Sequence, residues 1–283
     1  MLERAWRYKL KISRVAVISK EGHGEAKEVA RDLVKLLLNE GLSIVSFPNL
    51  HLRGVDHVPS VKGVKGTRPD LIITVSGDGT ILKILRVLDD TTPCLCVNVG
   101  GRGILAEIKP EQVEIAIQRI LHGDIKLERR TRISSEVRNR LLPPALNEVH
   151  LLRQTVAHTP VFTIDLGPGA IFNQRMDGLL ITTPTGSTGH SFSYGAPFLE
   201  GSLDAFMITP EGPVLGFPTV IKRTNSRVRV MSSFASNLVV DGQDVFNIES
   251  DTYITFTKHK RDAVFVRFDT AGPFRQLRNL GFK

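Results

Sequence analysis

Residues 71–88, LIITVSGDGTILKILRVL, decide how the first part of the chain folds. Residues 71–75 form a continuous apolar run, which is typical of a strand buried on both faces of a parallel sheet. Residues 80–88 carry apolar side chains at helical spacing. The segment Ser76-Gly77-Asp78-Gly79-Thr80 joins these two runs. The stretch therefore predicts a strand, a tight turn and a helix, with the turn at the carboxyl end of the strand.

The alternation of strand and helix continues on both sides of this unit. Apolar runs and helical spacing predict strands at residues 15–19, 42–47 and 93–99, and helices at residues 25–39 and 111–121. Residues 48–68 are rich in Gly, Pro, His and Lys and predict a loop. Strands that alternate with helices favour a parallel, doubly wound sheet. We therefore expect residues 1–125 to form an α/β nucleotide-binding domain.

After residue 125 the pattern changes to strands punctuated by turn residues. Residues 126–260 therefore predict a second, β-rich domain. The remaining residues, 261–283, are expected to form a C-terminal tail, and its return to the first domain stays open at this stage. Within the tail, residues 274–282 (FRQLRNLGF) indicate a short helix.

The composition excludes several classes of protein. Of the 283 residues, 41% are hydrophobic and 23% charged, which is typical of a globular protein and not of a disordered chain or a coiled coil. No apolar run is long enough to span a membrane, and the N-terminal residues show no secretory signal. Cys94 and Cys96 lie in a predicted buried strand, which favours core positions and a reducing, cytoplasmic location.

The net charge of +8 has two interpretations. We favour a basic globular protein without a special electrostatic role. The alternative is that the cations attract an anionic ligand such as a nucleotide. Aromatic residues make up only 6% of the chain, and no basic block is interleaved with them, so we expect no nucleic-acid partner.

The segment from Ser76 to Thr80 has the composition of a phosphate site. Gly77 and Gly79 permit a close approach of the backbone and positive φ angles, and a helix start offers free N–H groups to a phosphate. Asp78 next to a phosphate would either hold Mg²⁺ or accept a hydroxyl proton. The alternative is an ordinary turn in which Asp78 caps the helix.

Three further segments carry candidate polar groups. Asn147-Glu148 precedes an apolar strand and offers amide and carboxylate groups to hydroxyls such as those of a ribose. Residues 183–193, TPTGSTGHSFS, are mostly small or hydroxylic, and they predict a fixed turn that presents amides and hydroxyls to a nucleotide. Residues 239–243, VVDGQ, predict a hairpin with an Asp-Gly turn.

The order of these motifs resembles the NAD kinase family. GDGT is followed by NVGGRGILAEI, NEV, RMDGLLITTPTGSTGHSFSYGAP and VVDGQ, which together extend over nearly the whole chain. GDG alone is shared with lipid kinases and phosphofructokinases. The resemblance implies an α/β domain and a β-rich domain with the active site between them. It also implies phosphorylation of the adenosine 2′-hydroxyl of NAD, with ATP or polyphosphate as donor, Mg²⁺ as the usual metal, and a homodimer or homotetramer.

The resemblance also assigns roles to individual residues. Asp78 would be the catalytic carboxylate that activates the 2′-hydroxyl, and no residue is assigned as a metal ligand. The phosphate path would be lined by Gly77, Gly79 and Thr80. The dinucleotide would be held by Asp78, Gly79, Asn147, Glu148, Asp177, Thr188, His190 and Ser191, with His158, Arg175 and Gln243 as companions.

The sequence departs from the family pattern at two places. Ser76 stands where the family usually has glycine, and Gly189-His190 stands where Ala-Tyr is common. A histidine ring offers adenine a smaller stacking face than tyrosine does. These departures keep a second function open, a non-catalytic NAD(P)-binding sensor. A lipid kinase is a third reading, although no amphipathic basic anchor helix supports a membrane contact.

Overall fold

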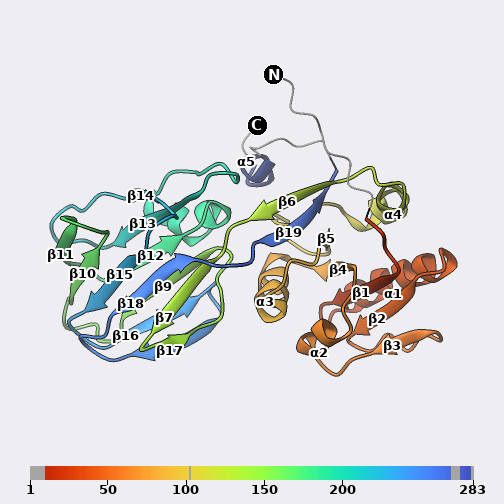
Figure 1. The fold of residues 1–283 in the computed structure, drawn as a ribbon, viewed down its shortest axis with the longest axis horizontal. Helices are drawn as coiled ribbons and strands as arrows, with labels where there is room; N and C mark the ends of the chain where they lie inside the picture. Colours follow the sequence, from red (N-terminus) through yellow and green to blue (C-terminus); the bar gives the residue numbers. More distant parts are fainter. Residues whose placement is uncertain (1–9, 102, 269–274, 282–283) are drawn as a thin grey trace, which may run out of the picture. The chain divides into compact units, whose positions relative to one another are not determined.

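The computed structural model describes residues 10–101, 103–268 and 275–281 of the chain. The chain divides into two compact units. Unit 1 comprises the residues up to Arg129 and those from Ala263 onward, and unit 2 comprises Arg130–Asp262. The sequence-based boundaries lay at 125/126 and 260/261. Figure 1 labels the elements of both units.

Unit 1 is built on a seven-stranded sheet with the order β3-β2-β1-β4-β5-β19-β6. Its strands are β1 (Arg14–Ser19), β2 (Ser43–Phe47), β3 (Val55–His57), β4 (Leu71–Ser76), β5 (Cys94–Asn98), β6 (Lys126–Arg130) and β19 (Ala263–Arg267). Strands β1 to β5 run parallel to their neighbours, and β19 pairs with β5 in the same sense. The C-terminal part of the chain therefore returns to the sheet of unit 1.

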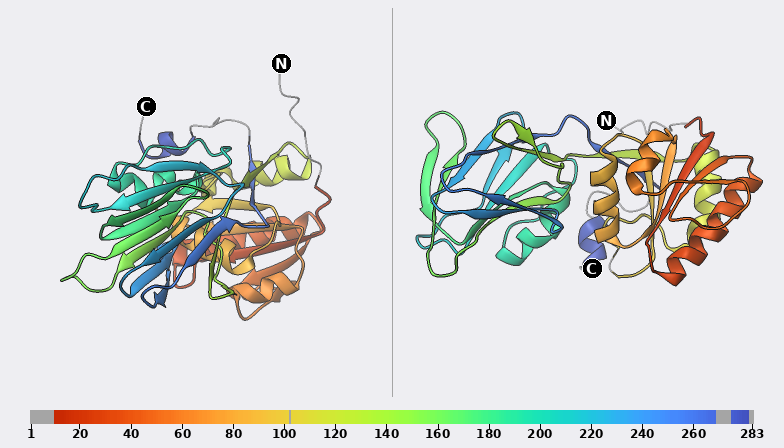
Figure 2. Two further views of the ribbon diagram at one scale, coloured as in Figure 1. Left: turned by 60° about the vertical axis from the view of Figure 1, so that its left-hand side comes forward. Right: turned by 90° about the horizontal axis from the view of Figure 1, so that it is seen from below.

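Helices cover both faces of this sheet, which confirms the doubly wound arrangement. The helices of unit 1 are α1 (Gly24–Asn39), α2 (Val61–Gly66), α3 (Asp78–Leu88), α4 (Val113–Leu121), preceded by the short 3-10 helix η1 (Pro110–Gln112), and α5 (Arg275–Asn279). Helices α1 and α4 lie on one face and α3 on the other (Figure 2). In α1, Ala30, Leu33 and Leu37 recur every three or four residues and are all buried, and each buried leucine contributes about 2 kcal/mol.

Two local expectations for unit 1 need correction or extension. Residues 48–68, expected to be a loop, contain β3 and α2. Ser60 starts α2, because its hydroxyl accepts a hydrogen bond from the Gly63 amide at 3.2 Å. The short C-terminal helix is confirmed as α5, although the ends of residues 274–282 fall outside the described residues.

Unit 2 is a sandwich of two six-stranded antiparallel sheets, as expected for a β-rich domain. One sheet contains β11 (Ile171–Arg175), β10 (Val161–Asp165), β15 (Val228–Ser232), β18 (Ile254–Lys258), β7 (Ile133–Val137) and β8 (Arg140–Leu141). The other contains β14 (Val220–Arg223), β13 (Ala205–Glu211), β12 (Gly178–Thr182), β9 (Glu148–Arg153), β16 (Ser236–Val240) and β17 (Asp244–Ile248). Apolar side chains from both sheets, such as Phe162, Val230 and Leu151, form one core.

The outer face of the second sheet carries the polar residues of the β9 strand. Val149 and Leu151 enter the core, so the alternation of a strand turns Glu148 and His150 to the opposite face.

The segment after β12 contains the short 3-10 helices η2 (Thr185–Thr188) and η3 (His190–Tyr194). The Asp-Gly hairpin is also confirmed, since β16 and β17 pair from Val240 and Asp244 outward.

Candidate active site

The GDGT turn of unit 1 leaves open space at the start of α3. Gly77 is the N-cap residue with φ −90° and ψ 171°, and Asp78 begins the helix. Neither Gly77 nor Gly79 adopts a positive φ, which corrects one expectation from the sequence. A Cβ added at either glycine would meet nothing within 4 Å. The glycines therefore leave room for a ligand at the helix N-terminus, where backbone N–H groups favour an anion.

The Asp78 carboxylate is held by a loop of unit 1 and does not cap its own helix. Oδ2 accepts a hydrogen bond from the Ile104 amide at 2.9 Å, and Oδ1 accepts one from the Leu105 amide at 2.9 Å. α3 has no side-chain cap at all. The capping alternative is therefore wrong. Each oxygen keeps a further lone pair, so a fixed carboxylate remains able to accept a hydroxyl proton.

The loop that holds Asp78 is itself fixed. Gly103 has φ +64°, which favours glycine, and a Cβ there would lie 2.5 Å from the side-chain nitrogen Nδ2 of Asn98. Arg267 of β19 donates to the carbonyl oxygen of Leu105 at 3.1 Å. It also forms ion pairs with Glu107 at 3.1 Å and Glu128 at 2.7 Å.

Two unpartnered polar atoms lie at the same edge of the sheet. Ser76 and Asn98 face each other in the register of β4 and β5, at the carboxyl ends of these parallel strands. The hydroxyl of Ser76 and the side-chain oxygen of Asn98 are buried and have no hydrogen-bond partner among the described residues. Open α/β sheets bind ligands at this edge. The geometry is therefore suited to a polar ligand.

In unit 2, Asp241 organises the start of β9. Its Oδ1 accepts hydrogen bonds from the amides of Asn147 at 2.8 Å and Glu148 at 3.3 Å, and its Oδ2 accepts one from the Leu146 amide at 3.0 Å. Sequence reasoning assigned Asp241 only to a turn and missed this role. The Asp-Gly pair indicated only the turn, in which Asp241 adopts φ 48°.

Asn147 and Glu148 present polar atoms that lack partners within the described residues. The Asn147 side-chain oxygen and Glu148 Oε2 are buried without a hydrogen-bond partner. Burial, and after it the negative charge of Asp241, raise the pKa of Glu148 to about 8. Leaving a buried carboxylate unpaired is costly, and ligand hydroxyl groups would relieve this cost.

Gly186 brings the TPTGST segment against these two residues. A Cβ at Gly186 would lie 2.3 Å from the backbone oxygen of Asn147. Glycine is therefore required for the close approach of η2 to the start of β9. Gly189 is also close, since a Cβ there would lie 3.1 Å from Glu148 Oε2.

A cluster of four polar side chains lies beside η3, and sequence reasoning found only one of them, His190. The Glu211 carboxylate accepts hydrogen bonds from His150 Nε2 at 2.6 Å and from the Tyr194 hydroxyl at 2.7 Å. The ring of His190 lies 5.1 Å from that of His150 and 5.2 Å from that of Tyr194. Burial lowers the pKa of His150 although Glu211 opposes this effect, and burial together with Glu211 raises the pKa of Tyr194 to about 12.

The remaining predicted residues of unit 2 lie in different surroundings. Asp177 forms an ion pair with Arg153 at 3.2 Å, and the hydroxyl of the fully buried Ser191 donates to the Gly186 carbonyl at 3.4 Å. The ring of His158 stacks on Phe234 at 5.9 Å. Of the other predicted residues, Thr188 is buried in η2, Arg175 is exposed at the end of β11, and Gln243 lies in the β16–β17 turn. Their roles stay predictions.

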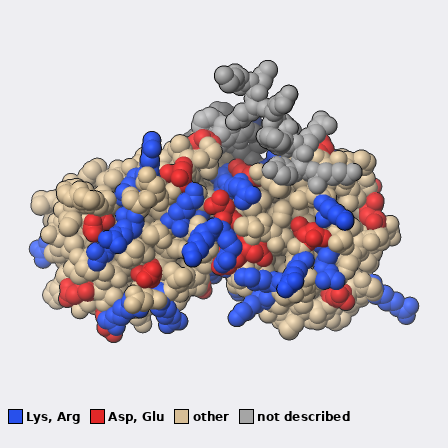
Figure 3. Space-filling view, viewed as in Figure 1, with Lys and Arg blue, Asp and Glu red and all other residues tan. Residues whose placement is uncertain are grey.

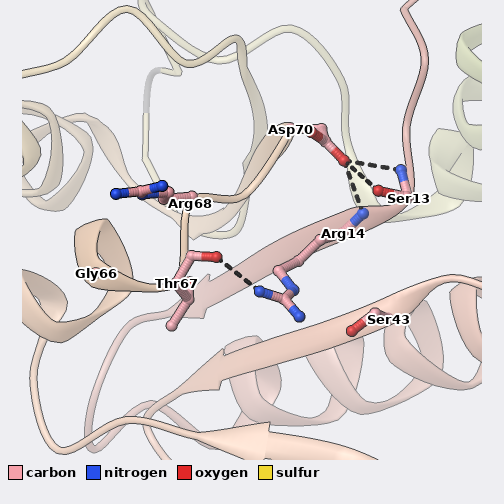
Figure 4. A pocket seen from close by; sticks show the side chains of 7 residues that line it. All are labelled: Ser13, Arg14, Ser43, Gly66, Thr67, Arg68 and Asp70. Atoms are coloured by element: carbon pink, nitrogen blue, oxygen red, sulfur yellow. Dashed lines mark hydrogen bonds between the residues drawn. The ribbon is translucent and has the colours of Figure 1, made fainter.

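A polar pocket at the opposite edge of the unit 1 sheet is held together by internal hydrogen bonds (Figure 4). Asp70 Oδ2 accepts hydrogen bonds from the amide and hydroxyl of Ser13 and from the Arg14 amide, at 2.8, 2.8 and 2.9 Å. Burial opposes ionisation of Asp70, but these hydrogen bonds outweigh it and lower its pKa. The pocket lies at the amino ends of β1 and β4, away from Asp78.

Three further observations concern the surface charge, metal-ligating side chains and membrane-spanning helices. On the face shown in Figure 3, lysine and arginine side chains are interspersed with acidic ones. Among the described residues, no group of three or more His, Cys, Asp or Glu side chains is arranged to hold a metal ion. No helix in the described part of the chain is long and apolar enough to cross a membrane.

Two family profiles match the chain. Residues 15–125 match the ATP-NAD kinase N-terminal domain, and residues 146–268 match the ATP-NAD kinase C-terminal domain. An NAD kinase of Methanothermobacter thermautotrophicus is 32% identical over 263 residues, which cover 90% of this chain and 91% of that relative. An NAD kinase of Thermococcus kodakarensis is 34% identical over 206 residues, which cover 71% of this chain and 74% of that relative.

Two solved structures share the fold. An NAD kinase from Archaeoglobus fulgidus, solved in complex with ATP, superposes with a TM-score of 0.75 at 27% identity and covers 95% of this chain and 97% of its own. A yeast NADH kinase complexed with NADH superposes with a TM-score of 0.86 and covers 96% of this chain and 88% of its own. At 22% identity, the second likeness is one of fold.

Proposed function

This chain belongs to the ATP-NAD kinase family, and we propose on that premise that it transfers a phosphoryl group from ATP to the adenosine 2′-hydroxyl of NAD. In this reaction the 2′-oxygen bonds to the γ-phosphorus, the bond to the leaving ADP oxygen breaks, and Asp78 takes the hydroxyl proton. Polyphosphate is a second donor of the same chemical class. The sensor and lipid-kinase readings are not favoured by the relatives.

The geometry of Asp78 carries this proposal. Its carboxylate lies at the carboxyl end of β4 and is fixed by the amides of Ile104 and Leu105 at 2.9 Å each. A fixed carboxylate beside an open helix start suits a reaction that depends on positioning and charge more than on covalent chemistry. Gly77 and Gly79 keep that helix start open for phosphate oxygens.

Unit 2 supplies the binding groups for the dinucleotide in this proposal. The unpartnered oxygens of Asn147 and Glu148 accept hydrogen bonds from ribose hydroxyls. The proposed adenine contacts are Thr188, His190 and Ser191, and Asp177 is assigned to the nicotinamide end. His158, Arg175 and Gln243 remain proposed companions of these residues.

A divalent metal is also part of the proposal, with Mg²⁺ as the expected ion. The described residues contain no acidic cluster that would hold a metal alone. They fit a metal carried mainly by donor phosphates, because Mg²⁺ commonly binds one or two carboxylates together with substrate phosphates. Asp78 has lone pairs for such a contact. When bound, the metal would neutralise charge on the donor phosphates.

The test is an NADP-forming assay with purified protein, NAD, Mg²⁺ and either ATP or polyphosphate. Asp78→Asn keeps the shape of the side chain and removes its basicity. We expect kcat to fall by roughly 100-fold or more, the usual range for a lost general base. Asp32→Asn, at an exposed position on α1, is the matched control and should leave kcat unchanged. Full turnover by Asp78→Asn would remove Asp78 from the reaction.

We also propose a homodimer or homotetramer assembled through unit 2. Ile171, Val214 and Leu215 of this unit expose 62%, 60% and 77% of their surfaces, and apolar side chains of this kind would be covered in the proposed contact. Light scattering on the wild type and on Leu215→Lys tests this assembly, and a wild-type monomer would contradict it. A cytoplasmic location is proposed because Cys94 and Cys96 are both buried free thiols.

A further inference from the structure

Glu211 links two elements of unit 2 through a single carboxylate. Oε2 accepts a hydrogen bond from His150 Nε2 in β9 at 2.6 Å, and Oε1 accepts one from the Tyr194 hydroxyl at the end of η3 at 2.7 Å. Both distances are short, as expected when the acceptor is charged. The carboxylate therefore ties η3 to the sheet over which it lies.

The ring of His190 lies against both partners of this carboxylate. Its centroid is 5.1 Å from that of His150, with an interplanar angle of 54°, and 5.2 Å from that of Tyr194, with an angle of 88°. Such tilted and edge-on arrangements are favourable for aromatic rings. His190 is exposed and His150 is buried. The exposed His190 ring therefore contacts two rings that the Glu211 carboxylate holds in place.

We propose that Glu211 is a positioning residue for the dinucleotide, which holds His150 and Tyr194 so that the His190 ring is fixed before adenine binds. This inference rests on the proposed function, which assigns the adenine contact to His190. A ring that is already ordered loses less conformational entropy on binding, so pre-organisation raises affinity. The effect should appear in NAD binding and not in the chemical step.

The charges around the cluster define which variants are informative. The Glu211 carboxylate faces His150 from β9 and Tyr194 from η3. His190 acts electrostatically on His150, and Asp177, whose own partner is Arg153, acts on the Tyr194 hydroxyl. Tyr194→Phe keeps the ring beside His190 and removes only the hydroxyl bond. Glu211→Gln keeps the side-chain volume but can no longer accept two charge-assisted hydrogen bonds.

Steady-state kinetics with NAD and ATP test the inference. Both variants should raise the KM for NAD by roughly three- to ten-fold, the range for one or two side chains that must be ordered on binding. The kcat and the KM for ATP should stay within two-fold of the wild-type values. Tyr253→Phe is a matched control, because Tyr253 is 38% exposed against 37% for Tyr194, and its ring packs under Arg229 instead.

Two results would overturn the inference. One is an unchanged KM for NAD in both variants, and the other is an equal loss in kcat and in both KM values, which would indicate a merely structural brace. The double variant provides a second readout. Because both changes break one network, it should be no worse than Glu211→Gln alone, and additive losses would contradict the network.

Failure of the inference and failure of the proposed function give different results. If the wild type forms no NADP and binds no NAD by calorimetry, the proposed function fails and the inference fails with it. If the wild type forms NADP and the variants bind NAD with unchanged Kd, only the inference fails. Calorimetry also covers a variant that is too weakly active for kinetics.

Discussion

Glu148 is expected to destabilise the unliganded protein at neutral pH, and Glu148→Gln should remove that effect. The carboxyl group is buried, and its Oε2 has no hydrogen-bond partner in the described part of the chain. Burial and the charge of Asp241 raise its pKa from 4.5 to about 8. Between these two pKa values the folded state binds a proton that the unfolded state has lost. Stability therefore falls as pH rises from about 4.5 to 8, and the contribution vanishes below 4.5, where both states are protonated.

The magnitude follows from the pKa difference. At 1.36 kcal/mol for each pKa unit, the 2.5 units between pH 4.5 and 7 correspond to about 3 kcal/mol. For a protein part of the size of unit 2, that free-energy difference corresponds to a shift of roughly 6–12 °C in Tm. Glutamine resembles the protonated acid and does not titrate. Glu148→Gln should therefore match the wild type in stability near pH 4.5 and exceed it by about 3 kcal/mol at pH 7.

Calorimetric unfolding of both proteins between pH 4.5 and 8.5 measures this difference. Glu136→Gln, at an exposed position of β7 in the same unit, is the control and should follow the wild-type profile. Parallel Tm profiles for wild type and Glu148→Gln would refute the reasoning, because they would show that Glu148 has the same pKa in both states. Stability that rises from pH 5 to 8 only in the wild type would reverse the sign and refute it equally.

The remaining predictions concern packing and backbone contacts. Arg267→Met removes the ion pair with the buried Glu107 and the hydrogen bond to the Leu105 carbonyl, and should destabilise unit 1 by about 3–5 kcal/mol. Arg119→Met, which breaks a half-exposed ion pair of the same unit, should cost about 1 kcal/mol or less by the same calorimetric measurement. Gly186→Ala forces a Cβ against the Asn147 backbone oxygen and should cost roughly 1–3 kcal/mol in urea unfolding, together with a weaker Kd for NAD. Gly216→Ala meets nothing within 4 Å and should be neutral in both measurements, so equal losses in the two variants would contradict the steric argument.

Features encoded over a few consecutive residues were predictable from the sequence. The continuous apolar run before Ser76 and the helical spacing after Thr80 identified β4 and α3, and the Asp-Gly pair identified the β16–β17 turn. The short β3 and α2 were missed because their signals are weak in a segment rich in Gly and Pro. The expected positive φ at Gly77 was wrong because a helix N-cap uses extended backbone, and the residue serves to leave space.

Contacts between distant segments could not be derived from local patterns. Asp241 binds amides that precede it by 93 to 95 positions, and Glu211 meets His150 across 61 positions. Nothing near Asp241 or Glu211 in the sequence marks these pairings, since the register of β9, β12, β13 and β16 creates them. Buried polar residues on a sheet face gain their partners only when the strands are in place.

The position of Asp241 explains why the fold retains the unfavourable burial of the Glu148 carboxyl group. Its carboxylate satisfies three backbone amides at the start of β9, so removing the charge would leave buried donors without partners. The same charge raises the pKa of Glu148. Asp241 therefore stabilises the start of β9 and at the same time makes ionisation of Glu148 less favourable. Ribose hydroxyls that donate to Glu148 would favour its ionised form, so NAD binding near pH 7 should release a proton to the buffer. Titration calorimetry in two buffers of different ionisation enthalpy measures that proton. If the wild type released no proton, or if Glu148→Gln still released one, Glu148 would not be the group that contacts the ribose.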